Sequence, residues 1–238
     1  MSFLTRVPVA AWMILDARDV ARGSVFFPLV GAAVGAATGL VAIGLAKVLP
    51  VFLAAAVAVA FHAVITGAIH LDAVADLADS LGGATPERAL EILRDPSVGA
   101  FGVMALVVDV LFQVGAIAAL LGETGLLAVV VSAFALGRAA PLVIGWALPY
   151  ARSGVGSGRA LTDEPRPWER VAGLVLAAAV VFALTGVRGF ALAAGAAAGT
   201  ALVAFVAWRR LGGATGDVLG AGIEAATLGA LLAAVATV

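Results

Sequence analysis

Three aspartates in the first half of the chain, Asp72, Asp76 and Asp79, have the residue type and the spacing to hold a metal ion. In an α-helix, steps of four and seven residues place all three on one face, within an arc of roughly 60°. Three like charges on one face repel one another. A divalent cation removes this repulsion, and carboxylate oxygens are ligands that Mg²⁺ prefers. The spacing therefore predicts a Mg²⁺ site on this face, against the alternative of a solvated end of a membrane helix.

Other ionisable residues stand inside long apolar stretches. Asp109, Arg138 and Glu224 are of this kind, and an ionised group at the centre of a bilayer costs roughly 2.5–3.5 kcal/mol on insertion scales. The partner of Arg138 is either an acid, Asp109 or Glu224, or a substrate phosphate, which arginine binds with two parallel hydrogen bonds. For Asp109, the alternative to a functional role is a protonated carboxyl group that is hydrogen-bonded to another helix.

The last apolar stretch begins with Thr215-Gly216-Asp217, and Glu224 follows seven residues after Asp217, on the same helical face. The free amides at such a helix start favour an anion. We expect Arg138 and Glu224 to border one water-filled cleft that opens toward Asp217 and the three aspartates. The alternative is a buried Arg138–Glu224 salt bridge without a cleft.

The composition is that of a polytopic membrane protein. Of 238 residues, 63% are hydrophobic and 12% charged, and the mean hydropathy is +1.14, whereas soluble domains are about 45–50% apolar and about 25% charged. A net charge of −1 without a basic tract argues against nucleic-acid binding. The lack of cysteine excludes thiol catalysis and thiolate metal sites, and His62 and His70 are too few for a histidine-built metal site.

Apolar runs that approach the roughly 20 residues needed to cross a bilayer occur seven times, at 24–46, 51–69, 98–121, 125–147, 170–186, 189–207 and 218–237. They predict an all-α, polytopic membrane bundle of about seven transmembrane helices with short interfacial helices, in one domain over residues 1–238. Thr85-Pro86-Glu87 has the residues of a helix start. Segment 70–97 is therefore expected to form two short helices at the interface, under the bundle.

The arginines and lysines predict the orientation of these spans. With the N-terminus in the cytoplasm, the cytoplasmic segments hold Arg6, Arg18, Arg22, Arg88, Arg94, Arg152, Arg159, Arg166, Arg170, Arg209 and Arg210, and the opposite side holds Lys47 and Arg188. This asymmetry follows the positive-inside rule. It predicts cytoplasmic loops at 70–97, 148–169 and 208–217.

Several motifs resemble cobalamin synthase, the adenosylcobinamide-GDP ribazoletransferase family. They are HLDAVADLADSLGG (70–83), PERALEILRDPSVGAFG (86–102) and RRLGGATGDVLGAGIEAATLG (209–229), with weaker matches at FLTRVP (3–8), FFPLVG (26–31), Gly137-Arg138 and PYAR (149–152). Ala73 and Ser80 stand where the family usually has glycine. Pro96-Ser97 stands where it usually has Ser-Arg, which removes a cation that could hold phosphate.

The resemblance implies a bacterial inner-membrane enzyme of the last steps of cobalamin biosynthesis, with its N-terminus and active-site loops in the cytoplasm. Such an enzyme transfers the adenosylcobinamide phosphate group from adenosylcobinamide-GDP to the 5′-hydroxyl of α-ribazole, or joins α-ribazole 5′-phosphate, releases GMP and needs Mg²⁺. The lipid bilayer is an expected partner, nucleic acid is not, and a homo-oligomer is left open. Asp72, Asp76 and Asp79 are then expected to share metal binding and base catalysis. The expected substrate contacts are Arg6, Arg94, Asp95, Arg138, Arg152, Thr215, Asp217 and Glu224.

Two other classes would use some of the same residues. A CDP-alcohol-type phosphotransferase acting on a lipid alcohol would also hold a metal on aspartates, but it typically carries an Asp-Gly then Ala-Arg arrangement that is missing here. An ion-coupled transporter would use Asp109, Arg138 and Glu224 as a path at the midplane. That class predicts internal repeats between the halves of the chain, and it leaves the aspartates at 72–79 unexplained.

Overall fold

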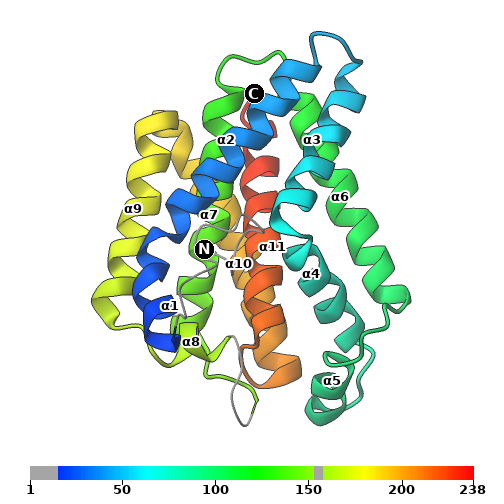
Figure 1. The fold of residues 1–238 in the computed structure, drawn as a ribbon, viewed down its shortest axis with the longest axis vertical. Coiled ribbons are helices and arrows are strands. Elements are labelled where there is room, and N and C mark those ends of the chain that lie inside the picture. Colours follow the sequence, from blue (N-terminus) through cyan, green and yellow to red (C-terminus); the bar gives the residue numbers. More distant parts are fainter. Residues whose placement is uncertain (1–15, 153–157) are drawn as a thin grey trace.

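The computed structural model describes residues 16–152 and 158–238, and within these ranges the chain is helical without a β-strand (Figure 1). This confirms the predicted all-α class. The elements are α1 (Ala17–Gly23), η1 (Ser24–Phe26), α2 (Phe27–Leu45), α3 (Val51–Thr66), α4 (Ile69–Ser80), α5 (Pro86–Ile92), α6 (Ala100–Leu120), α7 (Leu126–Ala147), α8 (Arg159–Thr162), α9 (Pro167–Thr185), η2 (Gly186–Arg188), α10 (Gly189–Leu211) and α11 (Gly216–Val235), where η marks a short 3₁₀ segment.

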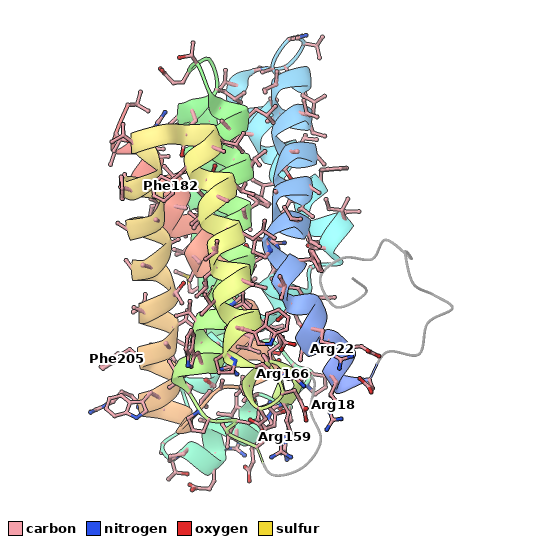
Figure 2. All side chains as sticks on the ribbon, turned by 90° about the vertical axis from the view of Figure 1, so that its left-hand side faces the viewer. Arg18, Arg22, Arg159, Arg166, Phe182 and Phe205 are labelled. Atoms are coloured by element: carbon pink, nitrogen blue, oxygen red, sulfur yellow. The ribbon has the colours of Figure 1, made fainter. Side chains whose placement is uncertain are left out.

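Five helical segments of the described ranges are long and apolar enough to cross a membrane, and the bent pair α3–α4 can form a sixth. The five are Ala17–Leu45, Ala100–Leu120, Leu126–Ala147, Pro167–Leu211 and Gly216–Val235. The fourth contains both α9 and α10, and Figure 2 shows the chain turning back between them at η2. The chain is thus a polytopic membrane bundle, while the total of seven spans and the single domain over 1–238 stay predictions.

Helix α11 lies at the centre of the bundle, where it packs against α10, α7, α4 and α6 (Figure 1). Glycines allow the backbones to approach one another, as small residues do in membrane helix pairs. Gly195 of α10 faces Gly229 of α11, and Gly137 of α7 lies against Ile223 and Thr227 of α11. These contacts fix the position of the helix that carries Asp217 and Glu224.

Replacing Gly137 by alanine is expected to destabilise the bundle by about 1–3 kcal/mol, because the added methyl group would overlap the Thr227 hydroxyl and lie 2.9 Å from the Ile223 carbonyl oxygen. Gly115 of α6 is the matched control, since no atom lies within 4 Å of its would-be Cβ. Thermal unfolding of the purified protein in detergent measures both variants. Equal midpoints for the two would contradict the packing described here.

The second predicted span, 51–69, ends earlier than expected and turns sharply. Gly67 (φ 68°) and Ala68 (φ 55°) adopt left-handed backbone angles, and α4 leaves α3 at 92°. Left-handed residues end a helix, and glycine is the residue that adopts them most readily. Of the predicted hairpin 70–97, α4 packs against α11 and α6 within the bundle, and the position of the hairpin at the membrane interface stays a prediction.

The connections gather at two ends of the bundle as the sequence predicted. Figure 1 shows α1, α5, α8 and the α10–α11 junction at one end, and the α2–α3 and α6–α7 turns with the C-terminus at the other. Arg18, Arg22, Arg159 and Arg166 lie together at the first end (Figure 2). The segments predicted to face one side of the membrane thus share one end of the molecule.

Candidate active site

Helices α4 and α11 bring acidic side chains together at the arginine-rich end. A cavity of about 110 Å³ lies between them and is lined by Asp72 and His70 of α4 and by Gly216, Asp217 and Gly220 of α11, among others. Asp76, half-buried one turn after Asp72, experiences the charges of Asp72, Asp217 and Asp79, with Arg152 as the opposing cation. Asp72 and Asp76 of α4 and Asp217 of α11, which is 141 positions after Asp76, therefore form one group of acids, called the acidic wall below.

Asp79, the third predicted metal ligand, contacts backbone amides. Its Oδ2 accepts from the Gly99 amide (2.7 Å) and its Oδ1 from the Gly102 amide (2.8 Å), so it caps the start of α6. Both glycines are needed there, because a Cβ on either would collide with this carboxylate. Within residues 16–152 and 158–238, no three acidic or histidine side chains are placed to hold a metal. The ready-made three-aspartate site is therefore absent from this part of the chain.

Replacing Asp79 by alanine is expected to act mainly on stability. The change removes the acceptor of two amides at the start of α6, and a hydrogen bond to a charged group contributes about 1.5–3 kcal/mol. We expect a lower unfolding midpoint, with a turnover per folded molecule that falls far less than for changes at Asp76. A stable, inactive Asp79→Ala protein would instead assign Asp79 to the reaction.

Arg152 joins three segments beside Asp217, one of the acids that line the cavity. Its Nη2 donates to Asp217 Oδ2 (3.1 Å) and to the Leu93 carbonyl oxygen (3.4 Å). An isolated β-bridge between Tyr150 and Ala214 holds the segment that contains Arg152 against the residues just before α11. Arg152 Nε is buried without a partner in the described chain. The guanidinium thus keeps a free donor beside the acidic wall.

Thr215 has a structural position: it is the N-cap of α11, its Oγ1 accepts from the Val218 amide (3.3 Å), and its hydroxyl lies 3.3 Å from Asp217 Oδ2. Arg94 and Asp95 follow Leu93 at the end of α5, and both are exposed. Hydrogen bonds from the Ser97 hydroxyl and amide hold the pKa of Asp95 below its usual value. These residues border the site, and their substrate contacts stay predictions.

Arg210, which the sequence analysis left without a role, ties α10 to the end of the aspartate helix. Its Nη2 donates to the carbonyl oxygens of Leu81 (2.6 Å) and Gly83 (3.0 Å). Arginine beside the last carbonyls of a helix satisfies groups that otherwise lack a partner. Together, Arg210 and Arg152 hold both ends of the segment that contains α5.

A second polar group lies deeper, inside the bundle. Asp109 and Gln113 of α6 and Glu224 of α11 are all buried, and the Gln113 amide donates to Asp109 Oδ2 (2.7 Å) and Glu224 Oε2 (2.9 Å). Asp109 was predicted to be hydrogen-bonded to another helix, but its partner Gln113 belongs to the same helix, and it is Gln113 that connects α6 to Glu224 of α11. Arg138 is fully buried, and within the described chain no acid lies within 4.0 Å of its guanidinium.

Two histidines stand between Arg138 and Glu224. Arg138 Nη2 is 3.4 Å from His62 Nε2 and 3.5 Å from His70 Nδ1, and Glu224 Oε1 is 4.0 Å and 3.7 Å from the same two nitrogens. Neither Arg138 nor Glu224 lines the cavity between α4 and α11; His70 does. The cleft predicted to reach Arg138 and Glu224 thus ends at His70, and the direct salt bridge is not formed.

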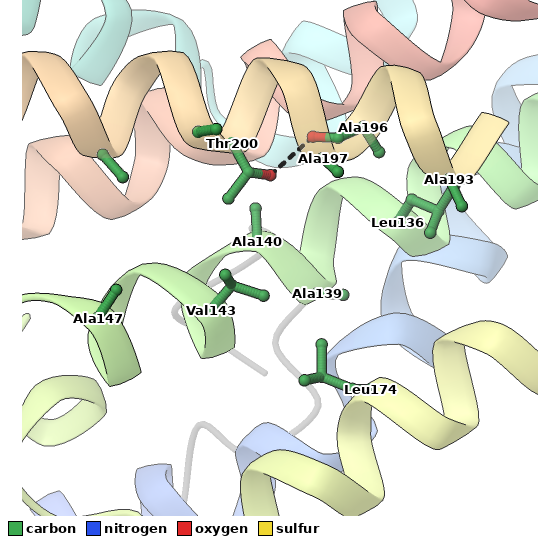
Figure 3. A pocket seen from close by; sticks show the side chains of 12 residues that line it. Leu136, Ala139, Ala140, Val143, Ala147, Leu174, Ala193, Ala196, Ala197 and Thr200 are labelled. Carbon is green, nitrogen blue, oxygen red and sulfur yellow. Dashed lines mark hydrogen bonds between the residues drawn. The ribbon is translucent and has the colours of Figure 1, made fainter. Parts of the chain in front are cut away.

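A larger cavity, of about 430 Å³, lies between α7, α9 and α10 (Figure 3). Its wall is apolar except for Thr200, and the Thr200 hydroxyl donates to the Ala196 carbonyl oxygen within its own helix (2.8 Å). No group in this wall can bind a phosphate or take a proton. Of these two cavities, the acidic one is therefore the candidate site. Two predicted parts, Arg6 and residues 153–157 of the loop 148–169, lie outside the described residues.

Comparison with known proteins agrees with this site. The family model described as cobalamin-5-phosphate synthase matches residues 1–235. The chain belongs to this family. The cobalamin-5-phosphate synthase match spans every helix described above, and it confirms the resemblance found in the motifs at 70–83, 86–102 and 209–229.

Relatives in this family carry one name, adenosylcobinamide-GDP ribazoletransferase. The protein from Syntrophobacter fumaroxidans is 36% identical over 93% of the chain and 90% of its own length, and that from Thiobacillus denitrificans is 38% identical over 98% and 92%. The Pseudomonas putida relative is 37% identical over 98% and 95%. No solved structure matches the chain. Nothing in these matches favours a lipid phosphotransferase or a transporter.

Proposed function

We propose that this protein transfers the adenosylcobinamide phosphate group from adenosylcobinamide-GDP to α-ribazole or α-ribazole 5′-phosphate and releases GMP. The observation that carries the proposal is the match over nearly the whole length to relatives named adenosylcobinamide-GDP ribazoletransferase. The acidic cavity supports it, because an acidic wall with an arginine paired to one of its carboxylates suits phosphoryl transfer from a diphosphate.

The reaction forms one phosphorus–oxygen bond and breaks another. A hydroxyl oxygen of the acceptor attacks the phosphorus that carries the corrinoid, the bond to the GMP oxygen breaks, and the hydroxyl proton passes to a base. The 5′-hydroxyl expected from the resemblance cannot attack in α-ribazole 5′-phosphate, since that oxygen already carries the phosphate. A ribose hydroxyl that both acceptors share fits either substrate.

We assign to Asp72, Asp76 and Asp217 the roles of orienting the acceptor hydroxyl and taking its proton. A positioned carboxylate contributes about 10²–10⁴-fold through general base catalysis. Arg152, with a free Nε, is placed to bind a phosphoryl oxygen of the leaving nucleotide. Holding both substrates in line is itself a large part of such catalysis.

We further propose that the site takes Mg²⁺. Arg152 is the cation that opposes the charges of Asp72, Asp76 and Asp217. A bound metal ion would balance the remaining negative charge. Mg²⁺ is commonly held by one or two carboxylates together with substrate phosphates and waters, so the lack of a three-ligand group suits it. When bound, it would neutralise charge on the diphosphate. Asp72 and Asp217, the two acids that line the cavity, would hold it, and Asp76 would add negative charge beside them.

The arginine-rich end of the bundle is proposed to face the cytoplasm of a bacterial inner membrane, in agreement with the positive-inside rule. The chain has no cysteine, so a single introduced one reports its own location. We expect Asp163→Cys, at the end with α8, to resist an impermeant thiol reagent in intact cells, and Val187→Cys, 84% exposed at the other end, to react. The reverse pattern would refute this orientation.

Purified protein in detergent tests the activity. Incubation with adenosylcobinamide-GDP, α-ribazole and Mg²⁺ should yield GMP and a corrinoid whose mass equals that of adenosylcobinamide phosphate joined to α-ribazole with loss of water. A protein that folds and binds neither substrate, or that releases GMP while leaving adenosylcobinamide phosphate as the product, would refute the proposed transfer.

A further inference from the structure

His70 stands at the boundary between the acidic cavity and the buried polar group. It lies in the first turn of α4, directly after the bend at Gly67 and Ala68, and only 2% of it is exposed. The residue lines the cavity together with Asp72 and Asp217, while its Nδ1 faces Arg138. Across the cavity, Gly220 packs closely against α4, because a Cβ there would lie 2.7 Å from Ala73 Cβ, whereas its distance to His70 Cδ2 would be an ordinary contact of 3.8 Å.

The contact with Arg138 determines which ring nitrogen of His70 carries the hydrogen. A guanidinium donates hydrogen bonds and cannot accept them. Nδ1 lies 3.5 Å from Arg138 Nη2 and 3.7 Å from Glu224 Oε1, and only the contact with Arg138 is within hydrogen-bonding distance. It favours Nδ1 as the acceptor and the ring hydrogen of the neutral imidazole on Nε2. This Nε2 is buried and has no partner in the described chain. Burying a donor without an acceptor costs free energy that a ligand oxygen would recover.

We propose that His70 donates a hydrogen bond from Nε2 to a phosphoryl oxygen of the diphosphate substrate bound at Asp72 and Asp217. The inference rests on the proposed function. A phosphoryl oxygen is a strong hydrogen-bond acceptor. A neutral imidazole can donate to this oxygen without forming an ion pair with the nearby carboxylates of Asp72 and Asp217. Arg138, behind the ring, polarises the imidazole toward donation. His70 is then a substrate-binding residue that the aspartate pattern does not include.

His62 provides a matched comparison. It is equally buried, its Nε2 lies 3.4 Å from Arg138 and 4.0 Å from Glu224, and its ring packs edge-on against Phe134. It does not line the acidic cavity. A purely structural role of the buried group would give both histidines the same importance, whereas substrate binding involves His70 alone.

The chain contains only two histidines, so nitrogen-15 labelling of histidine gives a simple spectrum. We expect the protein, purified without a histidine tag, to show His70 with its hydrogen on Nε2, assigned by comparison with His62→Gln. Addition of adenosylcobinamide-GDP and Mg²⁺ should shift the Nε2 resonance of His70 and leave the ring of His62 nearly unchanged. A hydrogen on Nδ1, or bound substrate without a shift at His70 Nε2, would overturn the proposal.

Two substitutions at position 70 give a second test. The amide nitrogen of glutamine reaches the place of Nε2, and that of asparagine the place of Nδ1. We expect His70→Gln and His62→Gln to bind adenosylcobinamide-GDP within about threefold of the native protein, and His70→Asn to bind about tenfold more weakly. Binding is measured by calorimetry, and thermal unfolding of each variant is measured beside it.

Weaker binding by His70→Gln than by His70→Asn would show that the Arg138 contact matters and would overturn the proposal. A native protein that does not bind the substrate would refute the proposed function itself.

Discussion

Replacing Asp76 by asparagine is expected to lower turnover by about 10³-fold or more while the protein stays folded. The charges of Asp72 and Asp217 both act on Asp76, so a change at Asp76 alters the charge of the whole acidic wall. Asparagine keeps the size of the side chain and removes the charge that would balance a cation or accept the hydroxyl proton. GMP release by the purified variant at saturating substrates measures the loss.

The control for this change is Glu91→Gln on α5, an exposed acid paired with Arg88 (2.8 Å) away from the cavity lining. An exposed ion pair contributes little to stability, so this variant should keep its turnover within about twofold. Both variants should unfold at nearly the native temperature. Near-native turnover of Asp76→Asn at limiting Mg²⁺ would remove Asp76 from the mechanism.

Replacing Arg152 by methionine is expected to reduce kcat/KM for adenosylcobinamide-GDP about 100-fold, because a charge-assisted hydrogen bond to phosphate contributes about 1.5–3 kcal/mol and the pairing with Asp217 is lost as well. The substitution also frees the end of α5 from its bond to the Leu93 carbonyl oxygen. Arg152→Lys should recover part of the activity, since lysine restores the charge without the two-pronged geometry.

Arg159→Met is the matched control for Arg152. Arg159 belongs to the same connection between α7 and α9, pairs with Asp163 (3.1 Å) and lies over the Tyr150 ring. We expect its loss to change kcat/KM less than threefold. If both arginine variants lost activity equally, the general charge of this end would be responsible rather than the position of Arg152.

Local patterns in the sequence predicted the parts of the fold that depend on neighbouring residues. The Thr85-Pro86-Glu87 pattern marks the start of α5, where Thr85 accepts from the Arg88 amide. Long apolar runs predicted α2, α6, α7, α9, α10 and α11 within a few residues. Such features follow from capping and hydropathy, which act within one or two turns.

Contacts between distant residues were not predictable in the same way. Asp79 shares the helical face of Asp72 and Asp76, and the sequence alone gave no reason to separate them. Its partners are amides 20 and 23 residues further on, at Gly99 and Gly102. The bend at Gly67-Ala68 likewise interrupts an apolar run that reads as one continuous span.

The histidines and Gln113 were missed for a related reason. Two histidines are too few for a metal site of their own, but they suffice to connect Arg138 with Glu224. Gln113 stands one helical turn after Asp109, a spacing that could have indicated a hydrogen bond within one helix. Its second bond, to Glu224, depends on the packing of α6 against α11.

The central claim is that an acceptor alcohol attacks the corrinoid phosphate and displaces GMP. The most direct measurement is the amount of GMP that purified protein releases from adenosylcobinamide-GDP in the presence and absence of α-ribazole, together with the corrinoid product formed. We predict one GMP for each joined product, and almost no GMP when α-ribazole is omitted. GMP release at the same rate without α-ribazole, with adenosylcobinamide phosphate as the product, would contradict this account and indicate a hydrolase.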